Sequence, residues 1–415
     1  MRSFRIGCLL GLRQIQRAST WTTILIVTVM MLTFLNLVAV SGILVGLITG
    51  AERAVQEQYI GDLQITPLLD EDRILHTNAL IAAIESDPYV DSYAVRYTAS
   101  GAVEANYRTR RDLRRDRDRI SGRISGIDPA AEQATTRLAD NVVEGDYLEP
   151  GETGYILIGS LFVERYTEDF PDIMDALTDV HPGDTVRVTI NDATQEFTVK
   201  GIVDAKVNEV RSSMYITDQE LRRLAGRPDR NADTIAITTN TGAAATAVQT
   251  NLIDAGYGNS ARIRTFAEAM PRFIMDIKDT FNILGVVIGS IGIVVASITI
   301  FIIIFINAIS RRRQIGILKG IGIDRRAIEI AYVLQAAFYV ILGSLLGAIL
   351  IYGYLIGYFD RNPLDFPFSD GILVAEPSET LLRFGILFVV TLIAGFIPAW
   401  LICRQNTLNA ILGRN

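Results

Sequence analysis

Lysine is scarce in this chain of 415 residues. The four lysines are Lys200, Lys206, Lys278 and Lys319, and none of them follows a glycine or precedes Ser or Thr. A Walker-type phosphate loop needs Gly-Lys followed by Ser or Thr, because the lysine contacts the β- and γ-phosphates and the hydroxyl binds magnesium. The chain therefore has no ATP site of this kind, and we expect it to bind no cofactor of its own.

Histidine and cysteine are equally rare, and they form no catalytic or metal-binding pattern. Neither His76 nor His181 belongs to a His-Glu-x-x-His motif or stands near paired cysteines. The Gly-x-Ser-x-Gly motif of serine hydrolases is absent. Cys8 and Cys403 lie near the two ends, so the segment 52–279 contains no disulfide and must be stabilised by its own core. No motif supports a membrane enzyme.

Charge is missing from four long stretches, which are the main feature of the sequence. Each stretch has at least the length of about 20 residues that a helix needs to cross a bilayer. The runs do not alternate as the strands of a membrane barrel do. We therefore predict four transmembrane helices. The uncharged runs are Ala18 to Ala51, Thr280 to Ser310, Ile330 to Phe359, and Phe384 to Cys403.

The distribution of Lys and Arg predicts the orientation. The first 20 residues and the loop 311–329 are basic, whereas the loop 360–383 is mostly acidic. By the positive-inside rule, both termini and the loop 311–329 are cytosolic. The segment 52–279 is then extracytoplasmic, and it carries 25 basic and 39 acidic residues, a net charge of −14. Such a surface does not suit nucleic acid, which needs basic contacts to phosphate.

The sequence thus predicts a polytopic α-helical membrane protein with one span, a large α+β extracytoplasmic domain, and three further spans. The first apolar run is too long for a signal peptide, so we interpret it as a retained anchor. The expected location is the inner (cytoplasmic) membrane. The predicted segments are an interfacial helix 1–20, spans 21–50, 280–310, 330–359 and 384–403, the α+β domain 51–279, a cytosolic elbow 311–329, an outer loop 360–383 and a cytosolic tail 404–415.

The elbow combines charge, an apolar edge and glycine. Arginines end the second span, and Ile315, Leu318 and Ile321 recur at helical spacing. Gly320 and Gly322 should end this helix. Asp324 is a suitable N-cap for the next one. Taken alone, the elbow is either a basic loop that only fixes topology or a docking surface for a partner.

Three other features of the sequence each have two possible interpretations. The polar Asn36 in the first span favours a hydrogen bond to another helix over a transport site. Small residues four apart favour close packing within the chain, or else a sliding or dimerising face. The charge run Arg108 to Arg119 is typical of a solvated hairpin tip more than of a binding site. The spaced glycines are Gly285 and Gly289, Gly343 and Gly347, and Gly353 and Gly357.

The chain resembles a known family at the elbow, at the end of the fourth span and in two stretches of the central segment. The elbow reads Arg311-Arg312-Arg313-Gln314-Ile315-Gly316-Ile317-Leu318-Lys319-Gly320-Ile321-Gly322. It is similar to the Arg-x-Arg-Glu-Ile-Gly-Ile-x-(Arg/Lys)-Ala-x-Gly pattern of FtsX-like ABC-transporter permeases, the family of the MacB and LolC/LolE proteins. Pro398-Ala399 with Leu408-Asn409-Ala410-Ile411 resembles the family's ending, and Gly126-Ile127-Asp128-Pro129 and Val199-Lys200-Gly201-Ile202-Val203 resemble its outer-domain strands. Gln314, Gly320 and Thr407 replace the Glu, Ala and Pro that are usual there.

The resemblance implies a permease domain over 280–410. It also implies that ATP is hydrolysed by a different subunit from the one that handles the substrate. A separate ABC ATPase subunit would bind ATP and magnesium and dock on the elbow, at Arg311 to Gly320 and Gly322. The outer domain would relay its motion, in a complex with a second permease chain as a homo- or heterodimer. Export or extraction of a lipophilic, peptide or lipoprotein substrate is then the expected function, with an extracytoplasmic substrate or adaptor protein as a further partner. The alternative is a non-transporting regulator or scaffold that activates a partner such as a cell-wall hydrolase.

Overall fold

The computed structural model describes residues 2–17, 19–108, 118–167, 175–310, 312–366, 368–371 and 373–404. Its contacts separate two compact units, which are described one at a time. The membrane unit comprises Met1–Thr49, Asp276–Phe366 and Asp370–Asn415. The α+β unit comprises Gly50–Met275 and Pro367–Ser369.

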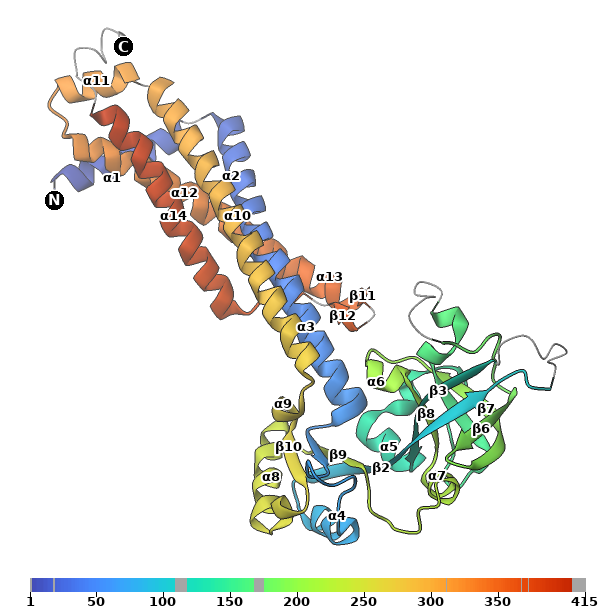
Figure 1. The fold of residues 1–415 in the computed structure, drawn as a ribbon. Helices are drawn as coiled ribbons and strands as arrows, with labels where there is room; N and C mark the ends of the chain where they lie inside the picture. The colour runs from blue at the N-terminus through green and yellow to red at the C-terminus, as the bar shows by residue number, and fades with distance from the viewer. Residues whose placement is uncertain are drawn as a thin grey trace. The chain divides into compact units, whose positions relative to one another are not determined.

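Four helical stretches are long and apolar enough to cross a membrane, and each extends beyond the uncharged run that predicts it. They cover Thr20–Ile60, Ile274–Ser310, Arg325–Arg361 and Pro377–Cys403 (Figure 1). The elements of the membrane unit are α1 (Arg2–Gln16), α2 (Thr20–Leu35), the π-helix η1 (Asn36–Val40), α3 (Ser41–Val55), α10 (Arg272–Ser310), α11 (Arg312–Gly320), α12 (Arg325–Leu350), the π-helix η8 (Ile351–Leu355), α13 (Ile356–Arg361) and α14 (Pro377–Cys403).

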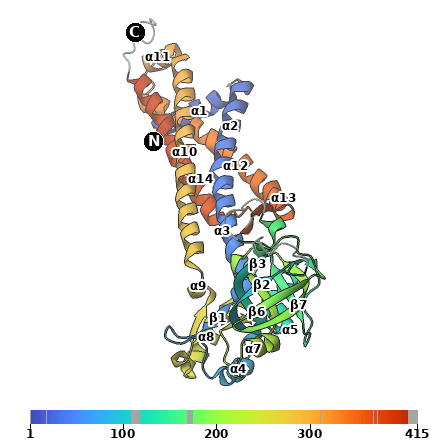
Figure 2. The same cartoon turned by 45° about the vertical axis from the view of Figure 1, so that its right-hand side comes forward.

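Helix α12 is the centre of this bundle, because α1, α2 and α14 all pack against it. Glycines let α2 approach closely. A Cβ added at Gly343 would lie 2.6 Å from Cβ of Met30, and one at Gly347 would lie 2.7 Å from a ring carbon of Phe34. Helix α10, the long helix that leads to α11 in Figure 2, is the least covered of the four spans.

Replacing Gly343 by Ala should therefore destabilise the membrane unit. The added methyl group would also lie 3.0 Å from the carbonyl oxygen of Val27, so α2 must shift, and overpacking of this kind costs about 1–3 kcal/mol. Gly357→Ala is the matched control, because a Cβ at Gly357 meets no described atom within 4 Å. Thermal unfolding of the purified full chain would measure both changes. Equal melting temperatures for the two variants would contradict this assignment.

The other predicted packing residues differ in their surroundings. Gly285 and Gly289 of α10 face the first span, with their added Cβ atoms 3.7 Å from Leu44 and 3.3 Å from Leu37. Gly353 and Gly357 face no described neighbour, since a Cβ added at either would meet nothing within 4 Å. Asn36 is exposed and has no side-chain hydrogen bond to another described residue, although its Oδ1 lies 3.2 Å from a Cβ added at Gly292 of α10.

The α+β unit begins with a small four-stranded sheet. Its strands are β1 (Leu63–Thr66), the first half of β2 (Val90–Glu104), β9 (Thr234–Thr239) and β10 (Arg262–Thr265), in the order β10-β1-β9-β2. All neighbours are antiparallel. The connecting helices are α4 (Thr77–Ser86) and α8 (Ala245–Asp254), which gives a split β-α-β arrangement.

A closed barrel is inserted between β2 and β9. The pairs β2–β3, β3–β8, β8–β5, β5–β7, β7–β6 and β6–β2 form a ring, and β4 (Val142–Gly145) extends it beside β7. The long strand β2 belongs to both parts (Figure 1). The remaining barrel strands are β3 (Arg119–Ile127), β5 (Tyr155–Gly159), β6 (Thr185–Ile190), β7 (Ala193–Val203) and β8 (Ser213–Thr217).

Short helices and turns complete the described chain. The helices are α5 (Pro129–Thr136), α6 (Asn208–Arg211), α7 (Asp218–Leu224) and α9 (Phe266–Ala269), with the π-helix η2 (Gln56–Ile60) at the end of α3. The 3-10 turns are η3 (Leu138–Asn141), η4 (Ser160–Phe162), η5 (Glu164–Tyr166), η6 (Gly242–Ala244) and η7 (Tyr257–Asn259), and the strands β11 (Leu364–Phe366) and β12 (Ser369–Gly371) form a hairpin.

Candidate functional site

The elbow is a short helix with a defined stop. Helix α11 ends at Gly320, and Gly322 adopts a positive φ of 90° that suits glycine. The amide of Ile323 donates to the carbonyl oxygen of Leu318 at 3.0 Å. The amide of Gly322 donates to the carbonyl oxygen of Lys319 at 3.1 Å. This is a Schellman motif. Asp324 then caps α12, since its side chain accepts from the amide of Arg326.

The predicted apolar edge of the elbow is divided between two faces. Ile315 is 4% exposed and Leu318 packs against the core of the membrane unit, so these two side chains stabilise the chain itself. Ile321 is 70% exposed, and Ile317 is 50% exposed beside it. The prediction of one edge with Ile315, Leu318 and Ile321 was wrong, because both edges are apolar and helical spacing alone cannot tell which one faces the core.

The exposed side of α11 is a continuous surface, which we call the elbow face. It consists of Arg313, Gln314, Ile317, Gly320 and Ile321. The opposite side holds Gly316 and Lys319 besides the two core side chains. Arg311 lies outside the described residues.

Polar contacts fix the elbow to the end of α14. The Lys319 Nζ atom donates to the carbonyl oxygen of Cys403 at 3.1 Å. The indole ring of Trp400 lies 4.2 Å from the guanidinium carbon of Arg404 and 6.0 Å from that of Arg325. Arg325 also pairs with Glu329 at 2.7 Å. A force applied to α11 would therefore act on α12 and α14 together.

A second group of residues joins the α+β unit to the helix that enters it. Ala54, Val55 and Ile60 belong to one buried apolar cluster with barrel residues such as Val203 and Tyr215. Ile274, in the first turn of α10, belongs to the same cluster. The ends of two long helices are thus part of the hydrophobic core of this unit.

A buried ion pair holds the end of the first helix. Arg96 of β2 binds Glu132 of α5 through Nε, at 3.1 Å to both carboxylate oxygens, and through Nη2, at 2.5 Å. The two side chains are only 7% and 2% exposed. Arg96 Nη1 also donates to the carbonyl oxygen of Tyr59 at 2.7 Å, and its guanidinium lies 5.1 Å from the Tyr59 ring. We call Tyr59, Arg96 and Glu132 the stalk clamp.

Glu132 keeps Arg96 charged despite its burial. Burial alone would lower the pKa of Arg96, but the charge and hydrogen bonds of Glu132 raise this pKa above its ordinary value. Arg123 of β3 reinforces the site, since its guanidinium lies 6.0 Å from the Tyr59 ring and donates to the carbonyl of Glu209. Two strands and a helix of the α+β unit therefore converge on one turn of η2.

The sequence around Gly126 to Pro129 explains how Glu132 is placed. Asp128 accepts hydrogen bonds from the amides of Ala130 and Ala131, and Pro129 occupies the first turn of α5. This cap starts the helix directly after β3, which brings Glu132 one turn later towards Arg96. Sequence reasoning missed the stalk clamp. Its only local signal is an arginine within a strand rich in Val, Tyr and Ala.

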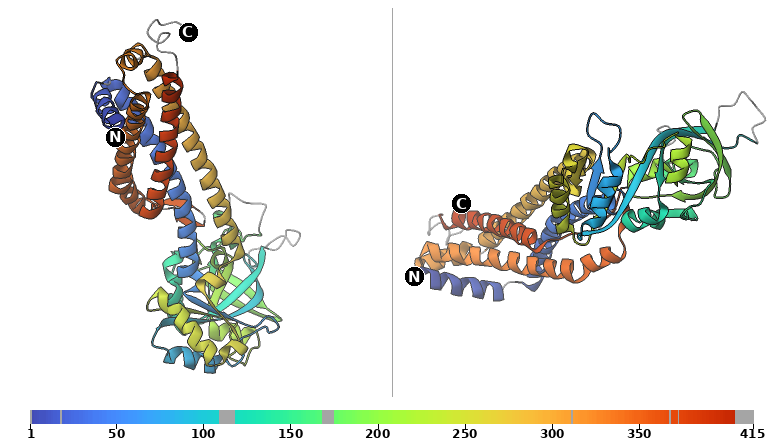
Figure 3. Two further views of the ribbon diagram at one scale, coloured as in Figure 1. Left: turned by 90° about the vertical axis from the view of Figure 1, so that its left-hand side faces the viewer. Right: turned by 90° about the horizontal axis from the view of Figure 1, so that it is seen from below.

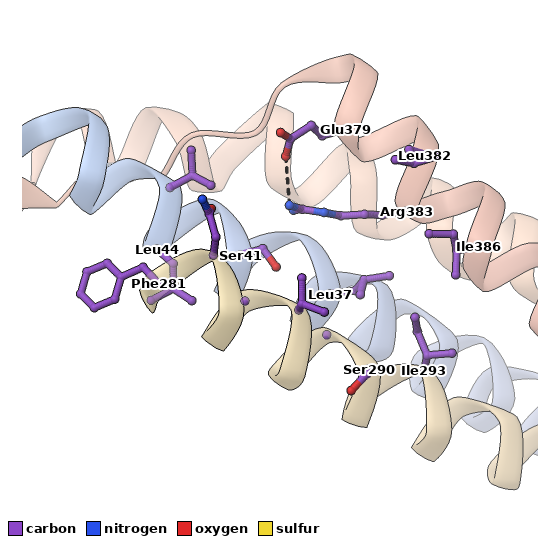
Figure 4. Close-up of a pocket in the computed structure, with 15 residues that line it drawn as sticks. Leu37, Ser41, Leu44, Phe281, Ser290, Ile293, Glu379, Leu382, Arg383 and Ile386 are labelled. Carbon is purple, nitrogen blue, oxygen red and sulfur yellow. Dashed lines mark hydrogen bonds and ion pairs between the residues drawn. The ribbon is translucent and has the colours of Figure 1, made fainter. Parts of the chain in front are cut away.

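A groove runs along the membrane unit between η1 and α3 of the first span, α10 and α14. It has a volume of about 470 Å³. Figure 4 shows apolar side chains along most of it, with Ser41 and the ion pair between Glu379 and Arg383 at the end where α14 begins. The pair spans 3.0 Å, and Gly285 and Gly289 of α10 are among the residues that line the groove.

Comparisons with known proteins agree with this architecture. The model of the MacB-like periplasmic core domain matches residues 29–255, and that of the FtsX-like permease C-terminal matches residues 286–407. No curated protein matches.

The solved structures that are similar to part of the chain include two transporter domains. One is the extracellular domain of the noncanonic ABC-type transporter YknZ from Gram-positive bacteria, with 12% identity over 49% of this chain and 99% of that one, at a TM-score of 0.33. The other is the periplasmic region of MacB from Actinobacillus actinomycetemcomitans, with 14% identity over 50% of this chain and 91% of that one, also at 0.33.

The protein is a multi-pass helical membrane protein with a large α+β extracytoplasmic domain between its first and second spans. The chain belongs to the FtsX/MacB-like family of ABC permeases, since the MacB-like model alone matches more than half of it. It is a membrane subunit of an ABC-type transporter, and the family implies an ABC ATPase as a partner.

Proposed function

We propose that the chain transmits mechanical force in an export complex. A separate ATPase docks on the elbow face, on the cytosolic side together with both termini, and its ATP-driven closure moves the first and second spans. These spans carry the motion to the extracytoplasmic domain, which expels a lipophilic, peptide or lipoprotein substrate. A second permease chain completes the complex.

The observation that carries the proposal is the burial of both helix ends in the domain core. Ala54, Val55 and Ile60 at the end of the first helix share one apolar cluster with Ile274 at the start of the second. The stalk clamp adds a charged attachment at Tyr59. If either helix end moved out of the domain, these apolar side chains would become exposed to water, which is unfavourable. The domain is therefore expected to move together with the helices.

Two further features support the proposal. Helix α10 is the most exposed span, which leaves a large apolar surface for a second permease chain. The apolar groove between η1 and α3, α10 and α14 favours a lipophilic substrate over a purely polar one, because pockets of about 300–1,000 Å³ with few polar groups hold such ligands. Co-purification of acylated proteins would distinguish lipoprotein extraction from drug or peptide export.

Joining α3 to α10 should stop export while leaving ATP hydrolysis in place. Leu44 and Gly285 face each other, with 3.7 Å between Cδ1 of Leu44 and a Cβ added at Gly285. In the full complex, Leu44→Cys with Gly285→Cys would be treated with a short cleavable cross-linker for thiols. We expect export to fall at least about tenfold and to recover when the linker is cleaved, since the two spans can then move apart again.

Variants that carry only Leu44→Cys or only Gly285→Cys, treated in the same way, are the controls for chemical modification, including that of Cys8 and Cys403. Undiminished export by the cross-linked chain would contradict movement between these helices. ATP hydrolysis with no export by any form of the complex, combined with capture of a cell-wall hydrolase by the full chain, would instead favour the regulator.

A further inference from the structure

Helix α1 packs against α12 through glycine rather than through its large apolar side chains. A Cβ at Gly7 would lie 2.8 Å from the carbonyl oxygen of Ala327, and one at Gly11 would lie 2.9 Å from the Leu334 side chain. Figure 3 shows the two helices side by side. Phe4 and Leu12 of this helix therefore remain 62% and 55% exposed.

This packing leaves a groove between α1, α12 and α14, which we call the elbow groove. Its volume is about 480 Å³. Phe4 and Cys8 line it from α1, Ile330 and Leu334 from α12, and Phe396 from α14. Because α12 and α14 are spans, an opening between them at this level meets lipid, and apolar walls favour an acyl chain over water.

The charged end of the elbow groove has one uncompensated cation among the described residues. Arg326 and Glu329 both line it. Glu329 is paired with Arg325 at 2.7 Å. The Arg326 side chain is exposed and has no ion pair with a described residue. It stands in the first turn of α12, and its backbone amide donates to the side chain of the N-cap Asp324, which leaves the guanidinium free of that contact. The charge therefore complements an anion.

We propose that the elbow groove binds an anionic phospholipid from the leaflet at this end of the bundle. The acyl chain lies between α1, α12 and α14, and the headgroup phosphate pairs with Arg326. This lipid joins α1 to the helix turn that directly follows the elbow. The strength of coupling between the elbow and the bundle then depends on the anionic lipid content of the membrane.

Retention of lipid by the purified full chain tests the proposal. The chain would be placed in nanodiscs of phosphatidylcholine with or without phosphatidylglycerol, extracted in mild detergent and analysed by native mass spectrometry. We expect the wild type to retain phosphatidylglycerol in preference to phosphatidylcholine. Arg326→Gln should lower this preference about tenfold, the value of one charge-assisted hydrogen bond. Arg13→Gln, an exposed arginine of α1 outside the groove, should leave it unchanged.

Cys8 provides a second readout that does not depend on Arg326. In a Cys403→Ser background it is the sole thiol, and N-ethylmaleimide should modify it several-fold more slowly in nanodiscs that contain phosphatidylglycerol. Ala337→Phe, which places a ring in the groove, should abolish the retention of phosphatidylglycerol while Arg326 stays in place.

Three results would overturn the proposal. Equal retention of both lipids by the wild type would mean unspecific annular lipid. A modification rate of Cys8 that ignores lipid composition would mean that no lipid covers the groove. Oxidative cross-linking of Cys8 between two chains would mean that a second copy occupies it.

Discussion

Glu132→Gln should destabilise the extracytoplasmic domain by about 3–5 kcal/mol, the usual cost of leaving one member of a buried ion pair without its partner. The cost is high here because Arg96 is 7% exposed and cannot be solvated by rearrangement. Hydrogen exchange of the full chain, followed at the amides of β2 and α5, would measure the change. The turn that holds Tyr59 should lose protection with them, since Arg96 binds its carbonyl oxygen.

Two controls separate this effect from a general loss of charge. Glu196→Gln breaks the pair between Arg108 and Glu196, whose side chains are 62% and 47% exposed, and exchange in β2 and α5 should be unchanged. Arg96→Met combined with Glu132→Leu should recover much of the stability, because an apolar pair avoids the desolvation of two charges. If Glu132→Gln and Glu196→Gln behaved alike, the stalk clamp would have no special role in holding the domain.

Replacing Ile317 and Ile321 together by Asp should prevent the ATPase from docking. Both side chains are exposed on the elbow face, at 50% and 70%, so the substitution leaves the fold intact. Buried apolar anchors at an interface contribute about 1–2 kcal/mol each or more, so the double variant should bind about 30- to 1,000-fold more weakly. Co-purification of the ATPase subunit with the full chain would measure the loss.

The matched control carries the same change on an unrelated surface. Leu69→Asp alters a side chain that is 86% exposed in the α+β unit, and ATPase binding should be unchanged. Ile315→Asp is a different case, since Ile315 is 4% exposed and the variant should fail to fold properly. Normal binding by the Ile317 and Ile321 double variant would show that the ATPase docks elsewhere.

Local features of this molecule could be predicted from the sequence. The spans follow from uncharged runs, because the bilayer penalises every charge within them. The elbow helix, its glycine stop and the Asp324 cap depend only on neighbours in the chain, and the structure confirms them.

Features that depend on distant residues could not be predicted. Arg96 and Glu132 are 36 residues apart, and nothing local indicates that they meet. The closed barrel depends on six strand pairings, one of which returns from β6 to β2. The elbow has two apolar edges. The bundle against which α11 packs determines that Ile315 is buried and that Ile317 stays exposed. These contacts form the candidate site, so the sequence indicated its location better than its geometry.

The order of strands in the small sheet links folding of the domain to insertion of the second span. Strand β1 lies between β9 and β10, and its residue Gln64 pairs with Arg264, 200 residues later in the chain. Closing so long a loop is slow compared with local pairing. The sheet is completed only when β10, which shortly precedes α10, has reached the same side of the membrane. Until then the edge of β1 stays open to other strands, so this interval is when the nascent chain is most exposed to aggregation.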